Sequence, residues 1–274
     1  MPLWGRIIHD GRECFGIIEG EAMLLHEGDM LADPRPTGQS IPLNGARLLT
    51  PTSPSKMVAL VDNYRALVAK LNHAVPAEPL YFLKANNSFI AGGEVIRAPK
   101  SYAGKVVYEG ELGIVIGKRC CAVSEADAAS CIFGYTCIND VTAIDILNKD
   151  PGFAQWTRAK GFDTFGVFGP VIETEIDPMT LSMRAYVNGE LQQDFPVTDY
   201  VFNPWQIVAE IARTVTLYPG DVIACGTTLN AAPIKPGDTV EIRIEGIGSL
   251  ANPVVAEQRA RASMPSRSRS DLAA

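Results

Sequence analysis

A buried strand that opens with two acidic residues constrains this chain more than any other feature. Glu109 and Glu111 precede a run of branched apolar residues, Leu112–Ile116, which Gly117 closes. Such a run is typical of a buried β-strand, and residues two apart on a strand point to the same face. The two carboxylates should therefore lie side by side at one end of the strand, where they repel each other unless a cation or a shared proton joins them.

A third acidic residue closes a second apolar run. Asp140 ends the segment Cys131–Asp140, which is also expected to form a strand. Three carboxylates at strand ends, with positions left open for water or substrate, suit a hard divalent cation such as Mg²⁺ or Mn²⁺. A Glu-x-Glu pair on a strand is, however, more often part of a solvent-exposed face. The residues alone leave both interpretations open.

The composition limits the class of protein. The chain has 274 residues, 47% of them apolar, which is enough for a sizeable core and one or two domains. It has no apolar run long enough for a transmembrane helix, and the segment Met1–Arg6 lacks the features of a signal peptide. A net charge of −7 argues against a nucleic-acid partner. Six cysteines in a chain of this length do not form a disulfide framework, so we expect a reducing, cytoplasmic location.

Turn signals and composition divide the chain into three parts. Residues 1–52 contain short alternating strands separated by Gly-containing turns, which predict a small N-terminal β lobe. Residues 53–257 contain the acidic strand ends and are expected to form the main domain. Residues 258–274 are rich in Arg, Ser and Ala and carry little apolar surface, which predicts a disordered tail.

Several elements of the main part have strong local signals. Met57–Val61 and Leu80–Lys84 are predicted strands, and Asn188-Gly189 between two alternating runs predicts a hairpin. Asn203-Pro204 predicts the start of a helix. The polar, glycine-interrupted segment Gln155–Asp163 is expected to be a loop. Strands outnumber helices and no regular βαβ rhythm is present, so the predicted fold class is a β-rich α+β protein.

Taken together, five segments resemble the fumarylacetoacetate hydrolase superfamily. They occur in the family's order between residue 56 and about residue 256: Tyr108–Leu112, Gly134–Ala143, Trp156–Thr164, Val187–Glu190 and Pro219–Thr227. The chain is similar to the branch that contains 2-hydroxyhepta-2,4-diene-1,7-dioate isomerases and acylpyruvases. The resemblance implies a mixed β-sandwich roll, usually assembled as a homodimer, that binds Mg²⁺ or Mn²⁺ together with a small oxo acid.

The resemblance also implies roles for individual residues. Glu109, Glu111 and Asp140 match the family's metal ligands. Lys160 matches the family lysine that helps to hold the negative charge developing on the substrate, as a donor aimed where charge appears. Three further residues are candidates for the substrate pocket: Lys84, Gln155 and Thr227.

The chain departs from the hydrolytic members at one motif. Those relatives have a pattern like Gly-Arg-Asn-Tyr-x-x-His-x-x-Glu, in which the His and Glu activate water. Here the segment is Val61–Lys70, with Leu67 at the His position and Lys70 at the Glu position. His73 lies nearby at a different spacing and is expected to be a surface histidine. Ile144 replaces an arginine that is common after the third metal ligand.

An intact metal site without the water-activating pair favours a particular chemistry. We expect an isomerase (tautomerase) or decarboxylase acting on a small 2-oxo or 2-hydroxydienoic acid or diacid. The alternative enzyme is a C–C hydrolase of an acylpyruvate or fumarylpyruvate type, with another base in place of the dyad. A second alternative is a non-catalytic relative that binds an oxo acid.

Overall fold

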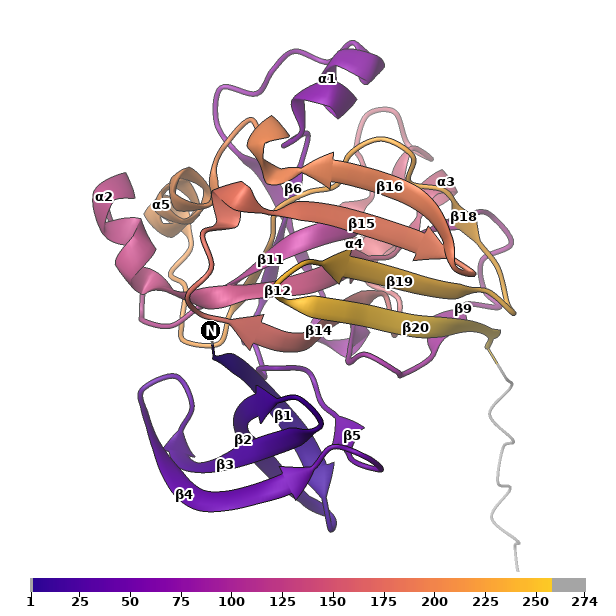
Figure 1. Cartoon of the computed structure of the whole chain (residues 1–274). Helices are drawn as coiled ribbons and strands as arrows, with labels where there is room; N and C mark the ends of the chain where they lie inside the picture. The colour runs from indigo at the N-terminus through magenta and orange to yellow at the C-terminus, as the bar shows by residue number, and fades with distance from the viewer. Residues whose placement is uncertain (1, 258–274) are drawn as a thin grey trace, which may run out of the picture.

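Three β-sheets form the body of the protein (Figure 1). The computed structural model describes residues 2–257, so the predicted tail at residues 258–274 lies outside the described part. The largest sheet has 12 strands. These strands are β1 (Leu3–His9), β2 (Arg12–Glu19), β3 (Ala22–Asp29), β4 (Asp33–Pro42), β5 (Arg47–Leu48), β6 (Met57–Val61), β7 (Leu80–Lys84), β8 (Phe89–Ile90), β11 (Gly110–Ile116), β12 (Ile132–Asp140), β14 (Gly166–Glu173) and β17 (Val222–Ala224).

The large sheet combines strands from the N-terminal part and from the main part of the chain. Its strand order is β4-β3-β2-β1-β14-β12-β11-β17-β6-β7, with β5 beside β1 and β8 beside β14. The N-terminal strands thus join the sheet through β1, where Leu3 pairs with Glu173 and Trp4 with Ile172. Figure 1 shows this indigo and violet N-terminal meander below the rest of the molecule.

A second sheet covers the centre of the first. It contains β9 (Ile96–Ala98), β15 (Ser182–Val187), β16 (Glu190–Pro196), β19 (Thr239–Ile244) and β20 (Gly248–Ala256). Strands β15, β19 and β20 pack on β11, β12 and β14, as the layers in Figure 1 show. The prediction of a β-rich α+β fold with a mixed sandwich is confirmed. The remaining strands form a small sheet: β10 (Val106–Val107), β13 (Thr142–Ala143) and β18 (Pro233–Ile234).

The two main sheets bury a continuous apolar core. Ile114 from the large sheet, and Met183 and Ile242 from the second sheet, are fully buried in the same cluster. Burying a side chain of this kind stabilises the fold by about 1.5–3 kcal/mol. A Cβ atom at Gly110 would lie 2.6 Å from the sulfur of Met183. The glycine between the two glutamates therefore lets the sheets approach each other at the end of β11.

The helices are short and lie at the margins of the sheets. They are α1 (Arg65–Leu71), α2 (Glu125–Ala128), α3 (Ile144–Leu147), α4 (Trp156–Lys160) and α5 (Pro204–Thr214), with 3₁₀ turns η1 (Asn86–Ser88), η2 (Ala129–Cys131), η3 (Pro178–Thr180) and η4 (Val197–Asp199). Within residues 2–257, none of them has the length and hydropathy needed to span a membrane.

The local sequence signals have mixed outcomes. The strands predicted at Met57–Val61 and Leu80–Lys84 are confirmed as β6 and β7. The hairpin is confirmed too, with φ of 54° at Asn188 and 83° at Gly189. The prediction of a loop at Gln155–Asp163 is wrong at its centre, because residues 156–160 form α4. Its first turn closes when the amide of Ala159 donates to the carbonyl of Gln155 at 2.9 Å.

The start of α5 gives a stability prediction. The side chain of Asn203 accepts from the amide of Gln206 at 2.9 Å, and the side chain of Gln206 accepts from the amide of Asn203 at 3.0 Å. Because such caps satisfy amides that have no helical partner, Asn203→Ala is expected to lower the free energy of unfolding by about 1 kcal/mol. Denaturant unfolding measures this change, and Asn203→Ser, which keeps an acceptor, should be nearly neutral. An equal loss in both variants would contradict the capping role.

Candidate metal centre and active site

The pairing of β11 with β12 brings the three predicted carboxylates together. The strands are antiparallel, and Gly110 pairs with Asn139, so the beginning of β11 meets the end of β12. The amide of Asp140 donates to the carbonyl of Glu109 at 2.9 Å. One carboxylate oxygen each from Glu109, Glu111 and Asp140 lies within 4.8 Å of the other two. The predicted ligands therefore form one cluster, in which Glu111 and Asp140 are fully buried.

Glu111 is the most unusual member of this acidic cluster. Its Oε2 accepts from the amide of Gly226 at 2.7 Å, whereas its Oε1 is buried and has no hydrogen-bond partner among the described residues. Burial raises the pKa of this carboxyl well above its usual range, and the nearby charges of Asp140 and Glu109 raise it further. A buried carboxylate oxygen without a partner is costly. A divalent cation would supply that partner, so the donor set fits a metal ion.

Two lysines enter the acidic cluster from other elements. The ammonium of Lys160, at the end of α4, donates to Glu109 and to Asp140 at 2.6 Å each. The ammonium of Lys84, at the end of β7, donates to the other oxygen of Asp140. Counted formally with every group ionised, the three carboxylates and two ammonium groups carry a charge of −1, and a bound divalent cation would change it to +1. The cluster is therefore balanced to receive a cation together with an anionic substrate.

The pKa values of these groups follow from burial and charge. Burial alone would raise the pKa of Asp140, but Lys160 and Lys84 lower it below its usual value. Burial would also lower the pKa of Lys160, yet the surrounding carboxylates raise it above the ordinary lysine value. Lys84 differs, because burial outweighs the attraction of Asp140 and its pKa is lowered. Lys160 is thus held as a cation beside Glu109 and Asp140.

A cavity of about 540 Å³ opens above the acidic cluster. Glu109, Lys160 and Thr227 line it on the side of the cluster. Its walls are mostly apolar, and they include Leu60, Leu67, Leu71, Leu80, Ile144 and Trp156. Ligand cavities of roughly 300–1,000 Å³ with a few convergent polar groups are typical of small-molecule sites. The cavity and the cluster together therefore form the candidate active site.

The three predicted pocket residues differ in their positions relative to the cavity. Thr227 lines the cavity. Lys84 is not among the described residues that line it; its side chain is buried against Asp140 instead. Gln155 also lies outside this lining and donates to the carbonyl of Phe153 at 3.3 Å.

His73 lies at the surface, as expected, and it also contributes to the wall of the cavity. His73 is half exposed, but it lines the cavity, and its Nδ1 lies 2.7 Å from Oδ2 of Asp62, which lines the cavity as well. Sequence spacing gave no signal for this pair, because the two residues are 11 positions apart on either side of α1.

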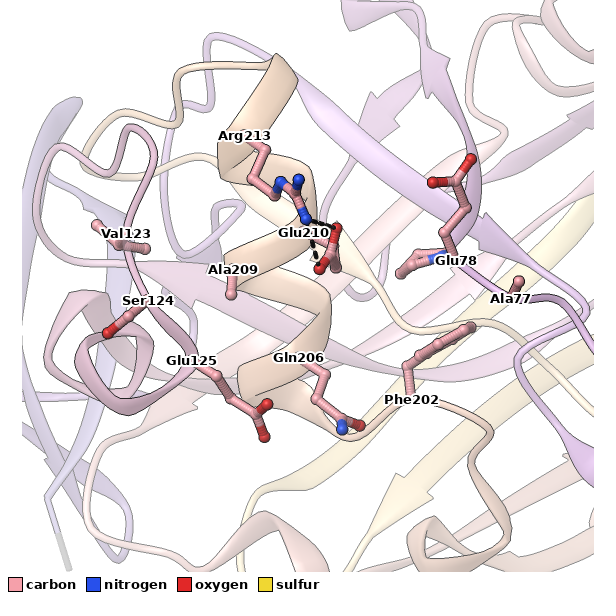
Figure 2. A pocket seen from close by; sticks show the side chains of 11 residues that line it. Ala77, Glu78, Val123, Ser124, Glu125, Phe202, Gln206, Ala209, Glu210 and Arg213 are labelled. Atoms are coloured by element: carbon pink, nitrogen blue, oxygen red, sulfur yellow. Dashed lines mark hydrogen bonds and ion pairs between the residues drawn. The ribbon is translucent and has the colours of Figure 1, made fainter.

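A second cavity, of about 430 Å³, lies beside α5 (Figure 2). Its lining includes Glu78, Glu125, Phe202 and the ion pair between Arg213 and Glu210, whose atoms are 3.2 Å apart. No residue of the acidic cluster and neither of its lysines is among the described residues that line this cavity. We therefore place the candidate chemistry in the first cavity.

Comparison with known families agrees with this arrangement. The family model for the C-terminal domain of fumarylacetoacetate (FAA) hydrolase matches residues 56–255, which contain all members of the acidic cluster. The chain belongs to the fumarylacetoacetate hydrolase family. A second family model, described as Rv2993c-like, N-terminal, matches residues 3–51.

Several fumarylacetoacetate hydrolase relatives have described activities. The crystal structure of 2-hydroxyhepta-2,4-diene-1,7-dioate isomerase from Mycobacterium marinum is 40% identical, with a TM-score of 0.86 over 94% of this chain and 100% of that one. Oxaloacetate tautomerase fahd2 of Xenopus laevis is 37% identical over 76% of this chain and 68% of that protein. Maleylpyruvate hydrolase from Sphingobium, in complex with manganese and pyruvate, is 27% identical with a TM-score of 0.76 over 93% of this chain and 100% of that one.

Proposed function

We propose that this protein is a Mg²⁺- or Mn²⁺-dependent isomerase (tautomerase) or decarboxylase of a small 2-oxo or 2-hydroxydienoic acid. The observation that carries this proposal is the acidic cluster under the cavity, with an unpartnered buried oxygen on Glu111. The activities of the isomerase and the tautomerase among the relatives support it. The manganese in the maleylpyruvate hydrolase structure supports an oxygen-ligated divalent ion.

The residues of the cavity fit a reaction that passes through an enolate. When bound, a divalent cation supplies Lewis-acid stabilisation of negative charge on the substrate oxygens. Lys160 lines the cavity next to the cluster, where its ammonium donates to Glu109, and it would donate to that charge on a bound substrate. The mostly apolar walls of the cavity contribute few polar groups, and less polar surroundings strengthen this electrostatic interaction.

Two substitutions in the family's hydrolytic motif favour isomerisation or decarboxylation over hydrolysis. Leu67 lines the cavity where hydrolytic relatives have the histidine, and Lys70 is exposed on α1. Isomerisation and decarboxylation need an electron sink and a proton relay, whereas hydrolysis also needs a positioned base for water. C–C hydrolysis of an acylpyruvate is the second candidate function, and it is supported by the maleylpyruvate hydrolase structure.

A substrate panel tests the proposed function. Purified protein with Mg²⁺ or Mn²⁺ is incubated with oxaloacetate, other 2-oxo diacids and acylpyruvates, and NMR identifies the products. We expect interconversion or decarboxylation of the 2-oxo acids to be faster than cleavage of acylpyruvates, and EDTA to stop both. Faster cleavage of acylpyruvates would establish the hydrolase instead. Metal-dependent binding of oxaloacetate without any turnover would identify a non-catalytic oxo-acid-binding protein.

Restoring the histidine and the glutamate of the hydrolytic motif tests whether their loss explains the expected preference against hydrolysis. The double change Leu67→His with Lys70→Glu is expected to raise acylpyruvate hydrolysis by about tenfold or more, because a positioned general base contributes roughly 10²–10⁴-fold. The initial rate of acylpyruvate cleavage measures the gain. Leu67→His alone is the control, since its imidazole would lack the orienting carboxylate. No gain from the double change would mean that the motif is not what separates this chain from the hydrolases.

A further inference from the structure

A histidine–carboxylate pair lies in the wall of the active-site cavity. The Nδ1 atom of His73 is 2.7 Å from Oδ2 of Asp62, and both residues line the cavity that Glu109 and Lys160 also line. Asp62 has a largely buried side chain, at 13% exposed, whereas that of His73 is 49% exposed. The carboxylate is thus the more buried member of the pair, and the imidazole is the more exposed one.

The backbone around α1 holds the two side chains together. Asp62 follows β6 with a φ of 53°, and Asn72 ends α1 with a φ of 54°. These left-handed conformations are uncommon outside glycine. The amide of His73 donates to the carbonyl of Val68 at 3.0 Å, which fixes the chain after the turn. The helix therefore separates Asp62 from His73 in sequence but returns them to the same place.

The hydrogen bond to Asp62 sets the tautomer of His73. An ionised carboxylate can only accept hydrogen bonds, so the Nδ1–H of the neutral imidazole donates to it. The other ring nitrogen, Nε2, then carries the lone pair and can take up a proton. This nitrogen has no hydrogen-bond partner among the described residues. By contrast, the other two ionisable side chains of the lining, Glu109 and Lys160, are hydrogen-bonded to each other.

We propose that His73 is the proton-transferring residue of the site and that Asp62 positions it. This inference rests on the proposed function and names the residue that moves the proton at carbon. The histidine and the carboxylate of the hydrolytic motif are replaced by Leu67 and Lys70 in α1. His73 and Asp62, which lie on either side of α1, provide the same two chemical groups from other positions. Imidazole is the side-chain group most often used for such transfers.

The proton transfer balances in both candidate reactions. In tautomerisation, Nε2 of His73 takes a proton from the carbon beside the ketone. The C–H electron pair becomes the new C=C bond, and the carbonyl π pair moves to oxygen. The imidazolium then returns the proton to this oxygen, which gives the enol and restores the neutral imidazole. In decarboxylation, the bond to the leaving carboxylate breaks and releases CO₂, and its electron pair forms the C=C bond of an enolate. His73, which takes up a proton from solvent at Nε2, donates this proton to the carbon and returns to the neutral imidazole.

Deuterium exchange at C3 of pyruvate tests the role of His73 at carbon. The exchange is followed by NMR with Mg²⁺, alongside decarboxylation of oxaloacetate. His73→Ala is expected to slow both reactions by about 10²–10⁴-fold, with unchanged Mn²⁺ affinity and melting temperature. Added imidazole should restore part of the rate, in proportion to its neutral form as the pH is changed. His9→Ala is the matched control, because it removes another histidine near an aspartate, at 3.5 Å in the N-terminal strands.

Variants of Asp62 separate positioning from folding. Asp62→Asn is expected to lower turnover, and Asp62→Glu to recover part of it, at an unchanged melting temperature. If His73→Ala does not fold, His73→Gln replaces it in every assay.

Each outcome decides between the two proposals. Wild-type rates in the His73 variants would overturn the role of His73 and leave the proposed function standing. The role of His73 at carbon would also be overturned if the His73 variants lowered the rate of acylpyruvate cleavage but not the rate of deuterium exchange, because His73 would then act as a base on water. If the His73 variants lose metal affinity and added imidazole does not restore the rate, the proposed role of His73 would also be overturned. The residue would then serve the structure of the site. A wild-type protein that neither exchanges nor decarboxylates any 2-oxo acid would overturn the proposed function, and the role of His73 with it.

Discussion

Replacing Glu111 with glutamine is expected to abolish metal binding and metal-dependent turnover while the fold persists. Oε1 of Glu111 is buried without a hydrogen-bond partner among residues 2–257. This oxygen is therefore free to coordinate a metal ion. Losing a hydrogen-bond partner of a metal ligand already costs about 10–100-fold in metal affinity. Loss of the ligand itself should therefore exceed about 100-fold.

Two measurements check this expectation. Titration with Mn²⁺ gives the affinity, and thermal unfolding with and without the metal gives the stabilisation by binding. A ligand at 100 times its Kd stabilises the folded state by about 2.7 kcal/mol, and this gain should vanish in Glu111→Gln. Wild-type metal affinity in the variant would show that the acidic cluster is not the metal site.

Glu173 provides the control for this change. It is fully buried on β14, and its Oε2 also has no hydrogen-bond partner among the described residues. It does not belong to the acidic cluster. Glu173→Gln therefore replaces a buried carboxyl group outside the acidic cluster, and it should leave the Mn²⁺ affinity unchanged.

The sequence predicts the acidic half of the site well because its signals are local. The apolar run Leu112–Ile116 identifies the strand, and the alternation of side chains places Glu109 and Glu111 together. The end of the second run identifies Asp140. What local patterns do not contain is the antiparallel register that joins the two strands, which is a long-range contact. The family resemblance supplied that link.

The remaining parts of the site depend on contacts that no local pattern encodes. Lys84 ends a strand, and a lysine there is usually solvated; only the fold reveals Asp140, 56 positions away, as its partner. The Asp62–His73 pair depends on two left-handed residues, neither of them glycine. The polar residues and Gly161 led to the prediction of a loop where the structure has α4. This helix places Lys160 in the acidic cluster.

Replacing Lys160 with methionine is expected to uncouple metal binding from turnover. Methionine keeps much of the volume of the side chain but removes the ammonium that lies 2.6 Å from both Glu109 and Asp140. The net charge of the cluster then changes from −1 to −2, so a divalent cation should bind at least as tightly as in the wild type. Turnover should nevertheless fall by about 10²–10³-fold, the usual cost of removing one donor aimed at developing negative charge.

Stability and kinetics together distinguish this role of Lys160 from a structural one. Breaking a buried ion pair on one side costs about 3–5 kcal/mol, so the metal-free Lys160→Met protein should unfold at lower temperature, and Mn²⁺ should recover more stability than in the wild type. Lys56→Met is the matched control, because Lys56 pairs at 2.5 Å with the fully buried Asp221, a residue outside the acidic cluster. That variant should lose stability and keep its kcat. If Lys160→Met binds Mn²⁺ and retains wild-type kcat, the lysine serves only to balance charge, and another group must stabilise the enolate.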